Sequence, residues 1–167
     1  MNRVQSFPPI ASKKSRVLIL GSMPGAASLK AKEYYAHPGN AFWRIMGKLF
    51  GAEPSLPYDE RVDRLQLVGV ALWDSLQACV RPGSLDASIT EEVPNNFPVF
   101  FAEHTAITHV FFNGKKSETV FRRFILPSLP DQARITPCPL PSTSSANTRM
   151  LFDAKVKAWS TVKKVLS

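Results

Sequence analysis

Four short apolar runs, separated by segments with helical spacing, constrain the fold of this chain more than any other feature. The expected strands are residues 16–22, 68–73, 108–114 and 135–140, the last interrupted by prolines. Each run is nearly continuous in apolar residues, as parallel strands buried on both faces are. The segments with helical patterns are residues 41–50, 58–67, 97–104, 117–126 and 151–166. This alternation predicts an α/β fold, a three-layer α/β/α domain with a central four-stranded parallel sheet.

The last helical segment has the clearest amphipathic pattern. Its apolar residues Leu151, Val156, Trp159, Val162 and Leu166 are expected on one side, with lysines on the other. We therefore predict a helix that packs through this apolar side.

The length of 167 residues suits one domain, and we expect an N-terminal arm over 1–15 and a single domain over 16–167. No apolar run approaches the roughly 20 residues of a membrane span. The first residues lack the apolar core of a signal peptide. Cys79 and Cys138 are too few for a disulfide framework, so we expect a reduced, cytoplasmic setting. A monomer is the default expectation.

The charge of the chain indicates the class of its partner. Lysine and arginine number 21 against 13 acidic residues, which gives a net charge of +8. A strongly basic protein favours a polyanionic partner such as nucleic acid, although solubility alone accounts for part of the excess.

Polar loops follow all four expected strands. They are GSMPGAASLKAKEYYAHPGN at 21–40, DSLQACVRPGSLD at 74–86, NGKKS at 113–117 and PSTSSAN at 141–147. Ligands of parallel α/β sheets bind beyond the carboxyl ends of the strands, where these loops meet. The first loop is longer than an ordinary connection between a strand and a helix, which itself indicates function. We expect the functional site on this edge.

Familiar cofactor and nucleophile motifs are missing from these loops. GKKS lacks the upstream glycine of a phosphate-binding P-loop, because position 109 is histidine, and no G-x-G-x-x-G fingerprint occurs. In GSMPG, Ser22 stands one position early for a nucleophile elbow. The histidines His37, His104 and His109 lack metal-ligand spacing. We therefore expect no cofactor and no metal.

Taken together, GSMPG at 21–25, YYAHPGNAFW at 34–43 and LPSTSSAN at 140–147 resemble the uracil-DNA glycosylase superfamily in order and separation. Met23 and Leu140 depart from the catalytic asparagine and histidine of its best-known branches. The further pieces LWD at 72–74 and GSLDASI at 83–89 resemble the hypoxanthine-DNA glycosylase branch. This resemblance implies a uracil-DNA glycosylase-like fold. It also implies a monofunctional repair enzyme that removes hypoxanthine from DNA and leaves an abasic site.

The resemblance assigns roles to the first loop. Tyr35 matches the aromatic residue that stacks on the flipped base, although it and Tyr34 could simply pack the loop. Asn40 is implied to hold the attacking water, although asparagine before a helix is also a preferred cap. For His37 we favour an ordering role. The remaining candidates, which would contact the water or the base, are Ser22 and the backbone of Gly21, Pro24 and Gly25.

Two side chains are candidates for reading the base. Hypoxanthine presents N1–H as a donor and O6 as an acceptor, and an amide such as Asn113 can match both. Asp74, if ionised, can only accept. The alternatives are turn chemistry for Asn113 and, for Asp74, a cap or a salt bridge with Arg81.

The last loop supplies hydroxyls suited to DNA phosphates. The phosphate candidates are Ser142, Thr143 and Ser144, with Lys115, Lys116 and Arg149 as electrostatic help. Ordinary helix capping is the alternative for any one hydroxyl.

Other functions remain open from the residues alone. The first is a glycosylase for uracil in G:U mismatches or single strands. The second is a non-catalytic DNA-binding module on the same scaffold. The third is a hydrolase of free nucleosides, which would not need the net charge of +8.

Overall fold

A parallel four-stranded sheet forms the centre of the computed structural model, which describes residues 3–167. The strands lie in the order β3-β2-β6-β7, and every neighbouring pair is parallel. Their bounds are β2 Val17–Gly21, β3 Val70–Asp74, β6 His109–Asn113 and β7 Thr136–Leu140. The predicted sheet is therefore confirmed, with each strand beginning and ending within two residues of its predicted range.

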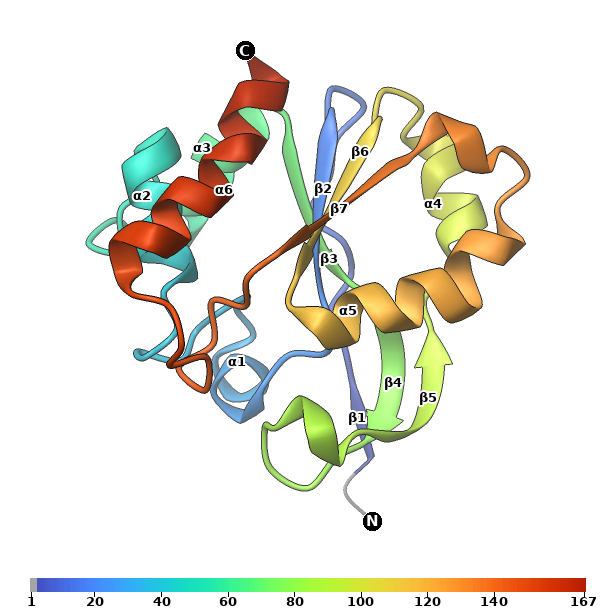
Figure 1. Cartoon of the computed structure of the whole chain (residues 1–167), viewed down its shortest axis with the longest axis horizontal. Helices are drawn as coiled ribbons and strands as arrows, with labels where there is room; N and C mark the ends of the chain where they lie inside the picture. Colours follow the sequence, from blue (N-terminus) through green and yellow to red (C-terminus); the bar gives the residue numbers. More distant parts are fainter. Residues whose placement is uncertain (1–2) are drawn as a thin grey trace.

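Helices cover both faces of this sheet (Figure 1). Val17 and Ile19 of β2 pack in one apolar cluster with residues of α2, α3 and α6, whereas Leu18 and Leu20 pack in another with residues of α4 and α5. The helices are α2 Phe42–Phe50, α3 Tyr58–Leu67, α4 Phe97–Glu103, α5 Lys115–Val120 and α6 Phe152–Leu166. Because successive side chains of a strand point to opposite faces, the continuous apolar strands fill two cores. The predicted three layers are confirmed.

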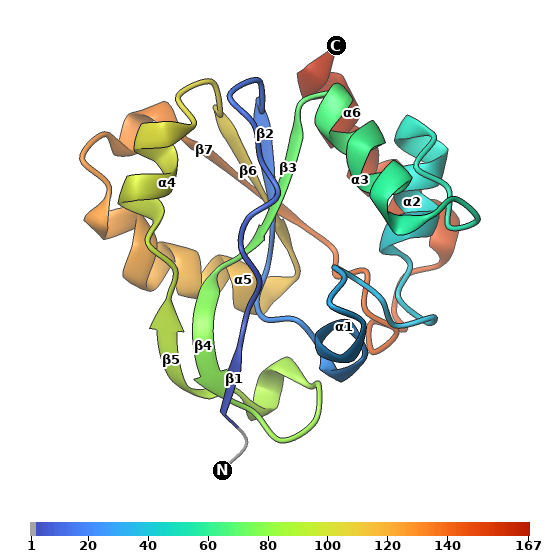
Figure 2. The same cartoon turned by 180° about the vertical axis from the view of Figure 1, so that it is seen from behind.

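A second, smaller sheet was not predicted. It is antiparallel with the order β1-β4-β5, and its strands are β1 Arg3–Gln5, β4 Leu76–Val80 and β5 Thr90–Pro94. It extends beyond the carboxyl end of β3 (Figures 1 and 2). The sequence pattern predicted a loop over 74–86, which is wrong for 76–80, since only Ser75 separates β4 from β3. The arm expected over 1–15 contributes β1, and its first two residues lie outside the described part of the chain.

Two helices differ from their predicted ranges. The helix expected over 117–126 begins at Lys115 and continues after Val120 as a wider π-helical stretch, Phe121–Ile125. The helix expected over 151–166 begins at Phe152, so Leu151 precedes it with an extended backbone and is 83% exposed. The predicted packing of Leu151 is therefore wrong, whereas Trp159 and Val162 are fully buried. Among residues 3–167, no helix is long and apolar enough to cross a membrane.

Candidate active site

The loops that follow the parallel strands enclose a cavity of about 490 Å³. This volume suits a small organic ligand such as a nucleobase. The lining residues from the predicted set are Gly21, Ser22, Pro24, Gly25, Tyr35, Asn40, Asp74, Asn113, Ser142, Thr143 and Ser144. Three predicted residues, Lys115, Lys116 and Arg149, are not part of this lining. Residues distant in sequence thus meet at the edge of the sheet where the site was expected.

Gly21 allows two polar groups to approach the end of β2. Its neighbour across the sheet is Asp74, at the end of β3. A Cβ atom at position 21 would lie 2.6 Å from Asp74 Oδ1 and 3.2 Å from the Tyr35 hydroxyl. Any other residue would therefore push these groups apart. Asp74 Oδ2 and the Tyr35 hydroxyl are both buried and make no hydrogen bond within the described chain.

Burial changes the acid–base behaviour of both groups. It raises the pKa of Asp74 from 3.8 to about 7, an effect that the nearby Arg81 opposes and Asp86 strengthens. Asp74 therefore exists in both neutral and ionised forms near neutral pH. Burial, with a contribution from Asp74, also raises the pKa of the Tyr35 phenol, which stays protonated and able to donate.

The ring of Tyr35 lies against Phe42, with 3.9 Å between ring centroids and 26° between planes. Its backbone has a left-handed φ of 57°, an unusual conformation for a residue other than glycine. Tyr34 instead has a packing role, because it is 4% exposed and its hydroxyl donates to the Pro8 carbonyl at 2.9 Å. The two adjacent tyrosines therefore have different surroundings, and the Tyr35 hydroxyl lies beside Gly21, as the Asp74 carboxyl does.

Asn40 lines the cavity and also supports the start of α2. Its Oδ1 accepts a hydrogen bond from the Phe42 backbone N–H at 2.9 Å. Asn40 lies one residue before Ala41, the N-cap of α2, so it supports the start of the helix without being its N-cap. Its side-chain nitrogen makes no hydrogen bond within residues 3–167. His37 orders the same loop, since its Nδ1 accepts from the Gly39 N–H at 2.9 Å.

A pair of hydrogen bonds joins the loops after β6 and β7. Asn113 Nδ2 donates to Thr143 Oγ1 and Asn113 Oδ1 accepts from the Thr143 backbone N–H, each at 2.9 Å. The Thr143 carbonyl in turn accepts from the Ala41 N–H at 2.9 Å. Thr143 is only 1% exposed, so its hydroxyl faces the protein and not the surface that DNA would contact. One hydrogen and one lone pair of the Asn113 amide remain for a ligand.

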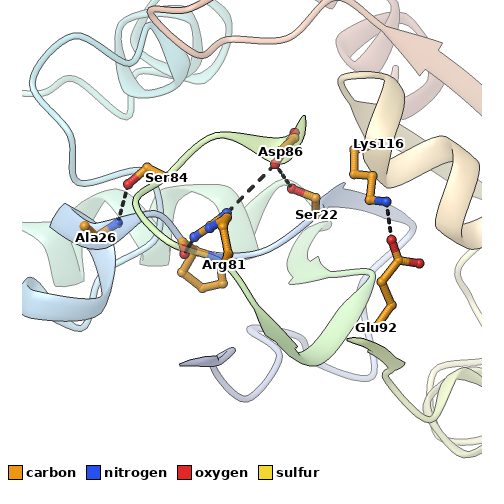
Figure 3. A network of polar contacts seen from close by, with 8 residues as sticks. Ser22, Ala26, Arg81, Ser84, Asp86, Glu92 and Lys116 are labelled. Atoms are coloured by element: carbon orange, nitrogen blue, oxygen red, sulfur yellow. Dashed lines mark hydrogen bonds and ion pairs between the residues drawn. The ribbon is translucent and has the colours of Figure 1, made fainter. Parts of the chain in front are cut away.

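A polar network that the sequence did not predict surrounds Ser22 (Figure 3). Ser22 Oγ donates to Asp86 Oδ1 at 2.6 Å, and Arg81 Nη1 lies 3.9 Å from the same oxygen. Arg81 is 2% exposed and also donates to the Pro24 carbonyl. No ion pair forms between Arg81 and Asp74, so that alternative for Asp74 is wrong. The motif GSLDASI contained Asp86, but position in a motif does not reveal which way a side chain points.

The predicted phosphate contacts differ in their surroundings. Ser142 Oγ accepts from the Ser144 N–H at 3.2 Å. Arg149 is exposed, and the Lys115 side chain is 87% exposed with Glu118 at 3.6 Å. Lys116 forms an ion pair with Glu92 of β5 (Figure 3), so its charge is partly neutralised. No group of His, Cys, Asp and Glu suited to a metal ion occurs among residues 3–167.

Comparisons with known proteins agree with this architecture. The family model described as the uracil DNA glycosylase superfamily matches residues 8–163. A protein named hypoxanthine DNA glycosylase from Methanosarcina barkeri (strain Fusaro) is 37% identical over 90% of this chain and 92% of its own length. A second protein of that name, from Methanosarcina acetivorans, is 31% identical over 87% of this chain and 89% of its own length.

A solved structure provides an independent match to the fold. The solution NMR structure of a Methanosarcina acetivorans protein, described as a candidate uracil DNA glycosylase, superposes with a TM-score of 0.80. The two chains are 30% identical, and the match covers 98% of each. Together with the site geometry, these matches show that the chain belongs to the uracil DNA glycosylase superfamily.

Proposed function

We propose that the protein is a monofunctional DNA glycosylase that hydrolyses the N-glycosidic bond of deoxyinosine, releases hypoxanthine and leaves an abasic site. The observation that carries this proposal is the buried, unpartnered Oδ2 of Asp74 in a cavity of about 490 Å³ that Asn113 also lines. A buried polar group without a partner is costly, so this oxygen is best explained by a polar ligand. The relatives named hypoxanthine DNA glycosylase support the same substrate.

The cavity offers hydrogen bonds that fit the edge of hypoxanthine. In the proposed complex, Asp74 Oδ2 accepts from N1–H and the remaining Asn113 Nδ2 hydrogen donates to O6. The base stacks on the face of Tyr35 opposite Phe42. Adenine at this position would place its N1 lone pair against Asp74, and each unmatched buried group costs about 1–3 kcal/mol.

The first loop is proposed to support the reacting sugar. Asn40 holds the attacking water below the sugar through its amide, while Oδ1 also supports the start of α2. Ser22 and the backbone of Gly21, Pro24 and Gly25 bound the water and the base on the side of β2.

Ser142, Ser144, Lys115 and Arg149 are proposed to contact the phosphates beside the flipped nucleotide. The two serines line the mouth of the cavity, and both basic side chains are exposed. Phosphate contacts of this kind position the DNA without reading its sequence.

Uracil is the second candidate base, because its N3–H and O4 present the same donor and acceptor pattern as N1–H and O6 of hypoxanthine. The structural relative described as a candidate uracil DNA glycosylase favours it. The larger purine is preferred here because two relatives are named for hypoxanthine.

The deciding experiment is alkaline cleavage of labelled duplexes that carry one deoxyinosine or one uracil. We expect release from deoxyinosine by the wild type and a loss of roughly 100-fold in Asn40→Ala, because a positioned polar group near the reacting centre is removed. Release from uracil alone would select the second candidate. Binding of both duplexes without release of either base would mean that the protein is a non-catalytic DNA-binding module.

Asn40→Ser separates catalysis from support of the helix start, because serine also accepts from backbone N–H groups at helix starts but is too short to hold the water. We expect this variant to melt near the wild-type temperature and to remain as slow as Asn40→Ala. Wild-type rates in Asn40→Ser would restrict Asn40 to its role at the start of α2.

We further propose that the protein acts as a monomer in the cytoplasm. The two thiols Cys79 and Cys138 are unpaired, as expected in a reducing compartment. Sedimentation velocity across a range of concentrations tests the oligomeric state, and fractionation of cells tests the compartment.

A further inference from the structure

Asp86 brings a carboxylate into the cavity from a loop that is remote in sequence from the other site residues. The loop also contains a short helical turn, Asp86–Ser88, between β4 and β5. Met23, directly after Ser22, is apolar and 6% exposed. Glu33, the carboxylate of the first loop, is not among the residues that line the cavity. The described lining contains two carboxyl groups, Asp74 and Asp86, and the first already lies with the base-reading groups.

The surroundings of Asp86 fix its position. Oδ1 accepts from Ser22 Oγ at 2.6 Å and lies 3.9 Å from Arg81 Nη1. Arg81 is almost completely buried and is itself anchored on the Pro24 carbonyl (Figure 3). The Asp86 side chain nevertheless remains 48% exposed. Ser22 and Arg81 thus hold the Asp86 carboxylate in place, while its exposed part remains accessible to a ligand.

The charge of Asp86 also affects two other groups that line the cavity. It contributes to the raised pKa of both Asp74 and Tyr35, after burial as the main cause for each. Coulomb interactions of this kind weaken with distance and with solvent screening. The geometry agrees, because Asp86 lines the same cavity as Asp74 and Tyr35.

Building on the proposed glycosylase function, we propose that Asp86 is the catalytic carboxylate that stabilises the positive sugar and accepts the proton of the attacking water. The bond between C1′ and N9 breaks, and its electron pair leaves on the base. The water oxygen forms the new bond to C1′, while its proton passes to Asp86. The departing hypoxanthine anion takes a proton from solvent. Asp86 later releases to solvent the proton that it accepted from the water.

A carboxylate is the group that this chemistry favours. Sugars that lose a leaving group pass through oxocarbenium-like transition states, and an adjacent negative charge stabilises the developing positive charge. In this arrangement Asn40 orients the water, and Ser22 is a positioning residue that holds Asp86.

The test compares Asp86→Asn, Asp86→Glu and Ser22→Ala with the wild type in single-turnover release of hypoxanthine from a labelled deoxyinosine duplex. Asparagine keeps the size of the side chain and its acceptor for Ser22, but it has no charge. We expect Asp86→Asn to lose about 100-fold or more in rate. Glutamate should retain more activity than asparagine, and Ser22→Ala should lose much less, because each still contains the carboxylate.

Binding to a duplex with 2′-fluoro-deoxyinosine, which resists release, separates a chemical role from a structural one. Asp86→Asn should bind this duplex at least as tightly as the wild type, because a negative charge near phosphates is removed. Asp131→Asn is the control, since Asp131 is exposed and precedes β7, away from the cavity. It should match the wild type in rate and affinity.

Each outcome decides a different question. A wild type that releases no base from deoxyinosine overturns the proposed function itself. An active wild type with Asp86→Asn within threefold of it overturns the role of Asp86. Equal losses in Asp86→Asn and Ser22→Ala would also overturn it, by showing that Asp86 acts only through Ser22. If Asp86→Asn fails to fold, Asp86→Ser decides in its place: a rate within threefold of the wild type overturns the role.

Discussion

At the residue scale, Asp74 combines two requirements that oppose each other. A carboxyl group is suited to accept from the N–H of a base, yet burial makes its ionised form unfavourable. Its pKa of about 7 lies far above the value of 3.8 for an exposed aspartate. The proposed role in base recognition therefore has a cost in protein stability, and the pH at which that cost arises can be measured.

Asp74→Asn should remove a pH-dependent part of the free energy of unfolding. Below about pH 4 the carboxyl is neutral in both states and has no effect. Between about pH 4 and 7 the unfolded chain loses its proton first, so the wild type loses stability as pH rises, by up to about 1.4 kcal/mol per pH unit. Above about pH 7 the effect levels off. Urea unfolding from pH 4 to 8 measures it.

Asp131→Asn is the matched control for this series, because Asp131 is exposed. Its unfolding free energy should follow the wild type at every pH. An equal slope in Asp74→Asn and in the wild type would mean that the Asp74 carboxyl does not hold its proton in the folded protein.

Residue types and spacing were enough to predict part of the site. Tyr35, Asn40 and Asp74 follow strands or precede a helix, so their place at the carboxyl edge follows from the topology. Arg81 and Asp86 could not be found in this way. Their importance depends on side-chain direction within a loop of irregular backbone, and no periodicity specifies that direction.

At the scale of elements, the four parallel strands were predictable because burial on both faces requires a continuous apolar run. The small antiparallel sheet was not predictable from the sequence. In β4, Gln77 is exposed between buried neighbours, and β5 contains mostly partly or fully exposed residues. Such short, mixed strands resemble loops until their partners are known, and β1 pairs with β4 across more than seventy residues of chain.

Thr143→Val tests whether the loop after β7 is fixed by the end of β6. Valine keeps the shape of threonine but cannot accept the hydrogen bond from Asn113 Nδ2. A buried donor is then left without its partner, and we expect a loss of about 1–3 kcal/mol in unfolding free energy. Release of hypoxanthine should slow as well, because Asn113 is no longer held toward the base. Urea unfolding and single-turnover rates measure both effects.

Thr136→Val is the control for this change, because Thr136 is exposed at the start of β7, the strand that precedes this loop. It should leave stability and rate near the wild type. If Thr143→Val behaved in the same way, the contact with Asn113 would have no role in ordering the loop.

At the scale of the whole molecule, the net charge of +8 is too large to be explained by the cavity, whose lining contains two aspartates and no lysine or arginine. The basic residues of the described chain lie outside this lining. We therefore attribute the charge to binding of the DNA backbone, which releases counterions and weakens as salt increases.

Lys115→Gln and Arg149→Gln should each weaken binding of an undamaged duplex and reduce the slope of log K against log salt by about one. Lys164→Gln is the control of equal charge change, because Lys164 is exposed near the C-terminus of α6. That end of the molecule lies opposite the short helix α1, Ala26–Ala31 (Figure 1). Fluorescence anisotropy over a salt series measures all three. An equal change of slope in Lys164→Gln would mean that the overall charge, and not the mouth of the cavity, attracts the DNA.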